Sequence, residues 1–596
     1  MGISNVRIGI IDTGICTLDK CFCKVQRTFD LKCENEREYQ IVEKELEDNI
    51  GHGTAVADII CDINPNIEFY IFRVSENENG IDERGLTYVL EYIYSYIEVD
   101  IINISLGCTY LFDYASLKGI CKRLTDRGVL LVSAFDNDGA ISFPAAYNEV
   151  IGVDINANIL NRKSLQLVKR GIVDVFVPNI YYRTFWKNKV SIVAGTSFAA
   201  ARVTGILSLK IDEWLGNRNK QMILETIVDG EYVIDEPQSF AKPDFLITRA
   251  IIFPINKETR AILQFHELLN FELVGAFDER LNGNIGKEIN GFKISSYLEI
   301  DWENNFDTVI LSCTEDLSEL TGIDYRQEFV QKVSKYNKKI YSFEMLQCKN
   351  MNVFYPIMNN RMVPKKNLGK LHHVTIPIIG VMGTSSQQGK FTLQLEIIKR
   401  LRKLGYKVGH IATEPSGYLF DADYVYHFGY HANLDIYPHE MIAILNEMIW
   451  RTQLLGKDII IAGSQSNTIH YIANNLENYP IDQYSFILGI QADCYILCVN
   501  PHDSIEYIMR TINFINSIDE GKVIAIVVFP IKTIEVGVGL KYVRKFLNKE
   551  ELEIIRNKLE ASCNMTVYAL DDMEQLDKLT DKIVDFFSED ECNVNI

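Results

Sequence analysis

Long apolar runs are missing from this 596-residue sequence. No stretch approaches the ~18 uninterrupted apolar residues that a membrane span requires, so the sequence predicts no association with a membrane. The first residues also lack an apolar segment with a basic flank and a cleavage site, which is the pattern of a secretory signal. We therefore expect a cytoplasmic protein.

Positive charge is scarce as well. The formal net charge is −20 and the sequence contains no long basic run, which argues against nucleic acid as a partner. A cationic peptide would suit the acidic surface, although a charged surface also serves solubility alone. Hydrophobic residues make up 47% of the chain, so we expect a fully globular protein. Its length suffices for about three or four domains.

The cysteines form no recognisable framework. Their number, 13, is odd, and a chain of this length buries enough core to need no disulfides. Four of them cluster near the N-terminus without the paired C-x2-C units of a zinc site: Cys16, Cys21, Cys23 and Cys33. We expect reduced thiols in buried positions or loops and predict no metal site. Metal binding by this cluster is the alternative.

Three short motifs carry the clearest chemical signal: DTG at Asp12, HGT at His52 and GTS at Ser197. Asp12 follows a run of apolar residues and so ends a buried strand, which is where active sites gather in an open parallel sheet. His52 and Ser197 each open a stretch with apolar residues at helical spacing. A serine hydroxyl becomes a nucleophile when an imidazole takes its proton, and a carboxylate fixes the tautomer of that imidazole.

Each of these residues has an ordinary alternative when it is taken singly. Asp12 fits a turn, and both His52 and Ser197 fit helix caps. Taken together, in this order, the motifs resemble the subtilisin-type serine proteases, and the resemblance runs from about residue 5 to residue 215. It implies that the three residues form a catalytic triad in an α/β fold with a parallel sheet.

The resemblance continues between the motifs. EVDIINISLG leads to the family's substrate-binding segment, here Ser105, Leu106 and Gly107. GVLLVSAFDNDG resembles the strand and loop that carry an oxyanion-binding asparagine. This places the amide at Asn137, or the equivalent position at Asp136 if the register shifts by one. The resemblance implies that proteolysis needs no cofactor.

The sequence departs from the subtilisin pattern at several points. Ala201 stands four residues after the nucleophile, where the family usually has proline, and Phe198 replaces a commoner methionine. A shortened segment lacks the family's calcium-binding loop, so we expect no tight calcium site. The chain begins almost on its first strand, which we interpret as a protease without a folding propeptide.

Polar, poorly periodic residues after the protease region predict a linker. DGEYVIDEPQSFAKPDF carries two prolines, and it separates a protease domain at 1–228 from the rest, with the linker at 229–245. A strand–helix–strand pattern then predicts a small Rossmann-like domain at 246–370, without the G-x-G-x-x-G pattern of dinucleotide binding. Residues 371–596 form the third α/β domain.

The third domain opens on a phosphate-binding pattern. A buried strand leads into GTSSQQGK and an apolar helix, so backbone amides and the helix N-terminus would face an anion. The loop resembles the GTxxxxGK loop of dethiobiotin synthetase and its relatives rather than a strict Walker A motif. The alternative is a plain strand-to-helix turn. The resemblance implies ATP or GTP with Mg²⁺, or an acyl-CoA, bound by Gly383, Thr384, Gly389, Lys390 and Thr392.

The rest of this domain resembles a P-loop family that includes a D-amino-acid N-acetyltransferase. Members carry an acidic residue where this chain has Ala462, and Phe391 follows the loop lysine, so magnesium-dependent hydrolysis is less strongly predicted. Glu414, at the end of VGHIATE, is a possible substitute for the acid. The middle and last domains together resemble a family of peptide-maturation proteins encoded beside short clostridial ribosomal peptides.

Three functions are compatible with these observations. The first is a cytoplasmic subtilisin-type endopeptidase that cuts a ribosomally made precursor peptide, acting beside peptide-modifying enzymes. The second is a nucleotide- or acyl-CoA-dependent transferase for peptides or amino acids, with an accessory protease domain. The third is a binding scaffold with an inactive protease. The complete set of four catalytic residues argues against the third and Ala462 weakens the second, so we predict the first.

Overall fold

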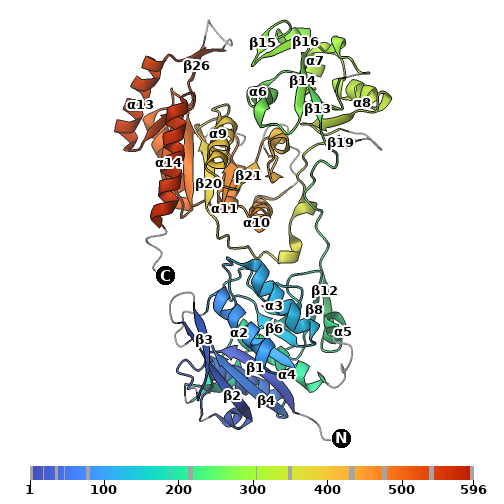
Figure 1. Cartoon of the computed structure of the whole chain (residues 1–596), viewed down its shortest axis with the longest axis vertical. Helices are drawn as coiled ribbons and strands as arrows, with labels where there is room; N and C mark the ends of the chain where they lie inside the picture. The colour runs from blue at the N-terminus through green and yellow to red at the C-terminus, as the bar shows by residue number, and fades with distance from the viewer. Residues whose placement is uncertain are drawn as a thin grey trace. The chain divides into compact units, whose positions relative to one another are not determined.

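The computed structural model of the chain contains two compact units (Figure 1). Met1–Pro237 and Pro364–Thr375 make up the first unit, and Gln238–Val363 and Ile376–Ile596 make up the second. No helix in the described part of the chain is long and apolar enough to span a bilayer. The structure describes residues 5–17, 19–33, 38–45, 47–75, 81–187, 189–211, 219–303, 305–346, 352–428, 436–472, 479–535 and 542–590.

A ten-stranded, mostly parallel sheet forms the centre of the first unit, in the order β12-β8-β9-β7-β6-β5-β1-β4-β2-β3. The pairs β2–β3 and β8–β9 are antiparallel. The strands are β1 (Val6–Asp12), β2 (Val25–Cys33), β3 (Tyr39–Glu43), β4 (Ile67–Arg73), β5 (Ile101–Ile104), β6 (Leu130–Ala134), β7 (Ile151–Asn156), β8 (Gln166–Lys169), β9 (Val175–Pro178) and β12 (Gly230–Val233). A separate hairpin joins β10 (Tyr182–Trp186) to β11 (Lys189–Val193).

Helices bury the apolar residues of this sheet. α1 (His52–Ile63) packs against α4 (Thr196–Leu209), and α2 (Glu83–Tyr96) packs against α3 (Tyr114–Asp126). Ile8, Ile10 and Ile11 of β1 are all fully buried, although successive side chains of a strand point to opposite faces. Burial on both faces explains why this strand is almost continuously apolar. A short helix, α5 (Lys220–Glu225), follows α4.

Part of the predicted linker at 229–245 is a strand. β12 lies at the edge of the sheet and pairs in parallel with β8. The next residue, Ile234, packs in a small buried cluster with Phe135 and Val168. The first unit therefore extends past residue 228, and its main segment ends at Pro237.

Two seven-stranded sheets make up the second unit. The first has the order β15-β16-β14-β13-β17-β18-β19, and the second has the order β22-β21-β23-β20-β24-β25-β28. The first comprises β13 (Arg249–Phe253), β14 (Glu272–Asp278), β15 (Glu288–Ile289), β16 (Phe292–Ser296), β17 (Thr308–Leu311), β18 (Lys339–Ser342) and β19 (Val353–Phe354). The second comprises β20 (Ile378–Gly383), β21 (Val408–Ala412), β22 (Tyr424–Val425), β23 (Ile459–Gly463), β24 (Cys494–Val499), β25 (Lys522–Val528) and β28 (Val567–Ala569).

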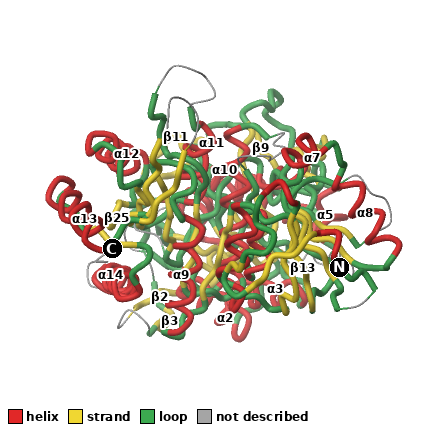
Figure 2. The backbone as a smooth tube through the Cα atoms, turned by 90° about the horizontal axis from the view of Figure 1, so that it is seen from above, coloured by secondary structure: helices red, strands yellow, loops and turns green. Residues whose placement is uncertain are grey.

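Helices pack against both of these sheets, and α10 and α11 lie side by side (Figures 1 and 2). A two-stranded sheet, β26 (Ile531–Glu535) with β27 (Tyr542–Phe546), stands apart from the two. The helices are α6 (Lys257–Gln264), α7 (Glu315–Thr321), α8 (Tyr325–Lys335), α9 (Lys390–Lys403), α10 (Pro438–Leu454), α11 (Ile481–Ile490), α12 (Ile505–Ile518), α13 (Lys549–Cys563) and α14 (Met573–Asp590). The chain is thus an α/β protein with parallel sheets, as the sequence predicts.

The two sheets of the second unit share an apolar core. Phe391 and Leu395 of α9 belong to the same buried cluster as Ile262 and Phe265, which lie in and after α6. The hydroxyl of Tyr341 donates to the carbonyl oxygen of Pro415 at 2.6 Å. The regions predicted as separate domains therefore pack together, and their boundary at residue 370 stays a prediction.

Candidate active site

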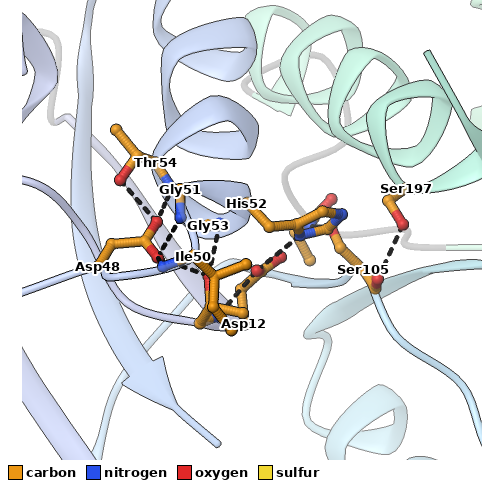
Figure 3. A network of polar contacts seen from close by, with 11 residues as sticks. Asp12, Asp48, Ile50, Gly51, His52, Gly53, Thr54, Ser105 and Ser197 are labelled. Atoms are coloured by element: carbon orange, nitrogen blue, oxygen red, sulfur yellow. Dashed lines mark hydrogen bonds and ion pairs between the residues drawn. The ribbon is translucent and has the colours of Figure 1, made fainter. Parts of the chain in front are cut away.

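The carboxylate of Asp12 holds the ring of His52. Asp12 ends β1 and His52 begins α1, and the Asp12 Oδ1 atom lies 2.7 Å from His52 Nδ1 (Figure 3). The same oxygen accepts a hydrogen bond from the backbone N–H of Thr13 at 2.8 Å. An ionised carboxylate only accepts, so Nδ1 carries the proton and Nε2 is left as the basic nitrogen. The arrangement suits a general base.

Glycine next to His52 allows this approach. A Cβ atom at Gly53 would lie 2.3 Å from the carbonyl oxygen of Gly14 and 3.2 Å from the Asp12 Cβ atom. Any side chain would therefore push α1 away from the end of β1. The glycines of the HGT and DTG motifs bring the histidine and the aspartate into contact.

The pKa of His52 is raised above its ordinary value. Burial lowers this pKa, but the attraction of Asp12, its hydrogen bond and the charge of Asp48 together outweigh the effect of burial. A base must be neutral to accept a proton, so the ring is competent at pH values above its raised pKa. The carboxylate thus makes the ring a stronger base.

Ser197 lies in the first turn of α4, next to the predicted substrate-binding segment. Its hydroxyl donates to the carbonyl oxygen of Ser105 at 2.9 Å, and Figure 3 shows this hydroxyl turned toward Ser105 rather than toward His52. The ring of the next residue, Phe198, lies 5.1 Å from the His52 ring, so the two elements are in contact. Rotation of the Ser197 side chain is needed to place its hydroxyl on Nε2.

Asn137 has the geometry of an oxyanion donor. Its Oδ1 atom accepts hydrogen bonds from the backbone N–H of Thr196 at 3.1 Å and from the Thr196 hydroxyl at 3.0 Å. This fixes the side-chain amide beside the residue that precedes Ser197 and leaves its N–H groups to donate. The alternative, Asp136, uses a carboxylate oxygen to accept from the N–H of Asp138 at 2.9 Å. A carboxylate cannot donate to an oxyanion, so the geometry favours Asn137.

The predicted substrate-binding segment joins two loops of the site. Ser105 follows β5 and is buried, whereas Gly107 is exposed. The next residue, Cys108, exchanges two backbone hydrogen bonds with Phe143, at 2.8 and 2.9 Å. A Cβ atom at Gly107 would lie 3.2 Å from the Cβ atom of Ser142. The segment therefore runs beside the loop that follows Asn137.

Asp48 supports the site, although it belongs to none of the three motifs. Its carboxylate accepts from the Thr13 hydroxyl at 2.9 Å and from the N–H of Gly51 at 2.7 Å (Figure 3). It also accepts from Ile50 N–H at 3.1 Å and from both the N–H and the hydroxyl of Thr54, at 2.9 and 2.7 Å. The sequence signal is an aspartate three residues before a turn glycine, which is a common turn arrangement.

We predict that Asp48→Ala destabilises the first unit by about 3 kcal/mol, because it leaves several buried donors without an acceptor. Denaturant unfolding followed by circular dichroism measures the effect, with Asp48→Asn as the matched control that keeps one acceptor oxygen. The unfolding midpoint of Asp48→Asn should lie between those of the wild type and Asp48→Ala. Equal unfolding midpoints for all three proteins would contradict the role given to this carboxylate.

The phosphate loop connects β20 to α9 in the second unit. Gly389 has a φ of 74°, in the left-handed region, and a Cβ atom there would lie 2.3 Å from Leu570. The ammonium of Lys390 donates to the carbonyl oxygens of Ser385 and Ser466, at 2.7 and 2.8 Å. Burial lowers the pKa of Lys390 to about 8. The hydrogen-bond partners of this buried ammonium are neutral carbonyl groups. Its positive charge can therefore attract an anion that binds at the loop.

The residues around the loop explain its departures from the family pattern. Phe391 packs against Phe420 in the shared apolar core, so it points away from the phosphate side. Thr384 is hydrogen-bonded to Asp503, a residue that the sequence analysis did not single out, while Thr392 lies half-buried in the first turn of α9. Ala462 is fully buried in β23.

Glu414 follows β21 and is the carboxylate considered for the missing acid. Burial, with the nearby negative charge of Glu258, raises its pKa to about 7, while Lys257 and Lys390 act in the opposite direction. α6, which begins at Lys257, packs against the short helix that Glu414 precedes. Lys390 and Glu414 therefore act on each other electrostatically, and they place a cation and a carboxyl group near the start of α9.

One group of potential metal ligands occurs among the described residues: Asp19, Cys21 and Asp58. Cys21 belongs to the cysteine cluster considered above. Asp58 forms an ion pair with Lys20 at 2.9 Å and accepts a hydrogen bond from the Thr184 hydroxyl at 2.7 Å. Protein groups therefore already compensate its charge.

Family models match both halves of the chain. Residues 4–242 match the subtilase family, and residues 366–572 match a P-loop domain of unknown function, DUF1611_C. These matches confirm the two resemblances that the motifs indicate, a subtilisin-like serine protease region and a P-loop region.

Curated relatives match the first region. Subtilisin DY of Bacillus licheniformis is 27% identical over 227 residues, covering 35% of this chain and 78% of that protein. The major intracellular serine protease of Bacillus subtilis (strain 168) is 33% identical over 190 residues, covering 28% of this chain and 57% of that protein. The human membrane-bound transcription factor site-1 protease is 28% identical over 236 residues, covering 35% of this chain and only 21% of its own length.

Solved structures also resemble this region. A cold-adapted subtilisin-like serine proteinase aligns with a TM-score of 0.30 and 19% identity, covering 37% of this chain and 80% of that chain. The epidermin leader peptide processing serine protease of Staphylococcus aureus aligns with a TM-score of 0.32 and 19% identity, covering 38% of this chain and 69% of that chain.

Proposed function

We propose that this chain, whose residues 4–242 form a subtilase-family domain, is a serine endopeptidase that cuts a ribosomally made precursor peptide in the cytoplasm. In this proposal the Ser197 hydroxyl attacks the scissile carbonyl and His52 accepts its proton. Asp12 holds the imidazole in the required tautomer. Asn137 and the backbone N–H of Ser197 bind the oxyanion.

The contact between Asp12 and His52 is the observation that carries the proposal. A buried carboxylate 2.7 Å from one ring nitrogen leaves the other nitrogen as a base with a raised pKa. The orientation of Asn137 by Thr196 adds a donor beside Ser197. Acyl transfer by a serine uses an oriented base and an oxyanion donor. The Asp12–His52 contact, the raised pKa of His52 and the orientation of Asn137 supply these features, and they support an active protease over a scaffold.

A processing role for the protease follows from what accompanies it. The protease region occupies the first unit, and most of the match to a P-loop domain of unknown function lies in the larger second unit. The sequence of residues 246–596 also resembles a family of peptide-maturation proteins. Fusion of the two suggests that cleavage and a second step act on one substrate, beside peptide-modifying enzymes. Similarity to an intracellular protease of Bacillus subtilis supports the cytoplasmic location. The net charge of −20 favours a cationic peptide.

A fluorescence-quenched peptide library tests the protease activity of the full-length protein. We expect cleavage of a subset of peptides, and loss of that cleavage after treatment with phenylmethylsulfonyl fluoride, which sulfonylates activated serines. Cleavage that resists the inhibitor would assign the activity to another group. No cleavage of any peptide by folded protein would favour the scaffold function.

We predict that Asn137→Leu lowers kcat by about 10²–10³-fold, the loss measured for the corresponding donor of subtilisin. The KM for the same peptide should change little, because the oxyanion forms only in the transition state. Asp136→Asn is the matched control at the alternative position and should give a smaller loss. A larger loss for Asp136→Asn would move the oxyanion donor to that residue.

The second unit supports a second candidate function, a nucleotide- or acyl-CoA-dependent transferase acting on peptides or amino acids. The observation that favours it is the buried Lys390 ammonium, whose pKa burial lowers to about 8 at the N-terminus of α9. The Lys390 ammonium donates to neutral carbonyl oxygens, and a bound phosphate would bring a negative charge to it. In this function the Thr392 hydroxyl and the Glu414 carboxylate would hold Mg²⁺. Glu414 would take the place of the acidic residue that family members carry at the position of Ala462.

We predict that Lys390→Ala weakens binding of a fluorescent ATP analogue by about 10- to 100-fold, the effect of losing one charged hydrogen-bond donor. Binding by the unmodified protein should also weaken as the pH rises past about 8, because Lys390 then loses its proton. Lys403→Ala, which replaces an exposed lysine in the last turn of the same helix, is the control. Equal affinities for all three proteins would contradict a phosphate site here.

A further inference from the structure

A short segment from the second half of the chain packs on the protease. Pro364–Thr375, which we call the strap, belongs to the first unit although the residues on both sides of it belong to the second. It lies far beyond residue 242, where the subtilase match ends. The strap is therefore an addition to the protease that the family model does not contain.

The beginning of the strap anchors it to the sheet of the first unit. The N–H of Ile172 donates to the carbonyl oxygen of Lys366 at 3.0 Å, and Leu368 packs against the buried cluster that contains Phe135. The ammonium of Lys370 lies 2.9 Å from Asp154 Oδ2, in an ion pair whose side chains are only 10% and 13% exposed. These contacts fix the strap beside the end of β6.

The middle of the strap reaches the loop that carries Asn137. The Lys370 ammonium lies 5.3 Å from the centre of the Phe135 ring, two residues before Asn137. The N–H of Ile141 donates to the carbonyl oxygen of Leu371 at 2.9 Å. The next residue, Ser142, uses its hydroxyl to accept from the N–H of Asp136 at 2.9 Å. The strap thus holds both ends of the oxyanion loop.

The end of the strap reaches the loop after the substrate-binding segment. The ring of His373 stacks on Tyr110, with centres 4.4 Å apart. The hydroxyl of Thr375 donates to the carbonyl oxygen of Leu111 at 3.0 Å. Both partners lie a few residues after Gly107, in the loop that pairs with the oxyanion loop through Cys108.

We propose that the strap is a positioning element for peptide binding, with Lys370 and His373 as its positioning residues. It contacts both the loop at 108–112 and the loop at 136–143, and so holds them in register with each other beside the substrate-binding segment. The proposal rests on the endopeptidase function. Its chemical consequence is that the residue of the peptide next to the cut bond is accepted only when the strap is in place.

Full-length protein with Lys370→Ala or His373→Ala tests the strap. Displacing a positioning contact by about 1 Å can cost 10²-fold, so we expect kcat/KM for a cleaved peptide to fall about 10- to 100-fold. The fall in kcat/KM should come from a higher KM. The variants should also show a weaker preference for the peptide residue next to the cut bond. Labelling by a small fluorophosphonate, which contacts the nucleophile but not a peptide site, should change much less. Lys365→Ala, an exposed lysine of the same strap, should match the wild type.

Hydrogen exchange keeps the two proposals separate. Lys370→Ala should speed amide exchange in peptides covering 105–112 and 136–143, whether or not the protein cleaves anything. Unchanged exchange and unchanged KM would overturn the positioning role. A parallel fall in fluorophosphonate labelling and peptide cleavage, or general unfolding of both variants, would also overturn it. Faster exchange in Lys370→Ala, together with a folded wild-type protein that cleaves no peptide, would keep the positioning contacts and reject the endopeptidase function.

Discussion

We expect Ser197→Ala to lower kcat for a cleaved peptide by about 10⁶-fold, the size of the loss when subtilisin loses its nucleophile. The reason is that the proposed mechanism uses the Ser197 hydroxyl as its nucleophile, and alanine has no group that His52 could activate. The Ser197 hydroxyl is buried in the first turn of α4 and bonded to Ser105, so its loss removes one hydrogen bond and little packing. Quenched-peptide hydrolysis by purified full-length variants measures the effect.

Ser116→Ala is the matched control for this prediction. Ser116 is exposed in the first turn of α3, just as Ser197 lies in the first turn of α4, and the proposed mechanism gives Ser116 no role. The control should keep wild-type activity, and both variants should unfold at similar temperatures. Activity of Ser197→Ala within tenfold of the wild type would place the chemistry elsewhere in the chain.

Asp12→Asn has the second-largest expected effect, a loss of about 10⁴-fold in kcat at neutral pH. An asparagine can offer its N–H to Nδ1, which stabilises the wrong tautomer and places the proton on Nε2. It also removes the negative charge that stabilises the protonated ring. Peptide hydrolysis by this variant and by Asp62→Asn, an exposed aspartate on α1, measures the loss.

The pH dependence gives this variant a second readout. In the wild type, activity should rise with pH through the pKa of His52, which lies above its ordinary value because Asp12 outweighs the effect of burial. Removing the charge leaves burial as the main influence, so the midpoint should move to lower pH in Asp12→Asn. A midpoint that stays unchanged would show that Asp12 does not set the basicity of the ring.

Motifs predicted the protease site because its residues lie at the ends of strongly patterned elements. Asp12 closes the largely apolar strand β1, and His52 and Ser197 lie in the first turns of α1 and α4, so each position follows from the spacing of apolar residues. The same reasoning located Lys390 at the start of α9. Elements of this kind are readable because burial imposes a period on the sequence.

The remaining features depend on contacts between distant residues. Asp48 accepts from Thr13, far away in the chain, and a single aspartate in a polar stretch gives no sign of such a partner. Asp503 reaches Thr384 in the same way. The strap packs through backbone groups and a lysine whose aspartate lies two hundred residues earlier, and no periodicity marks it. Such pairings are set by the fold, so the sequence pattern does not contain them.

The position of the fluorophosphonate adduct tests the central claim most directly. Full-length protein is treated with the probe, digested, and its modified peptide identified by mass spectrometry. The account predicts a single modification, on the hydroxyl of Ser197, in a protein whose Asp12→Asn variant reacts far more slowly. Modification of another residue, or no modification of the folded protein, would contradict it.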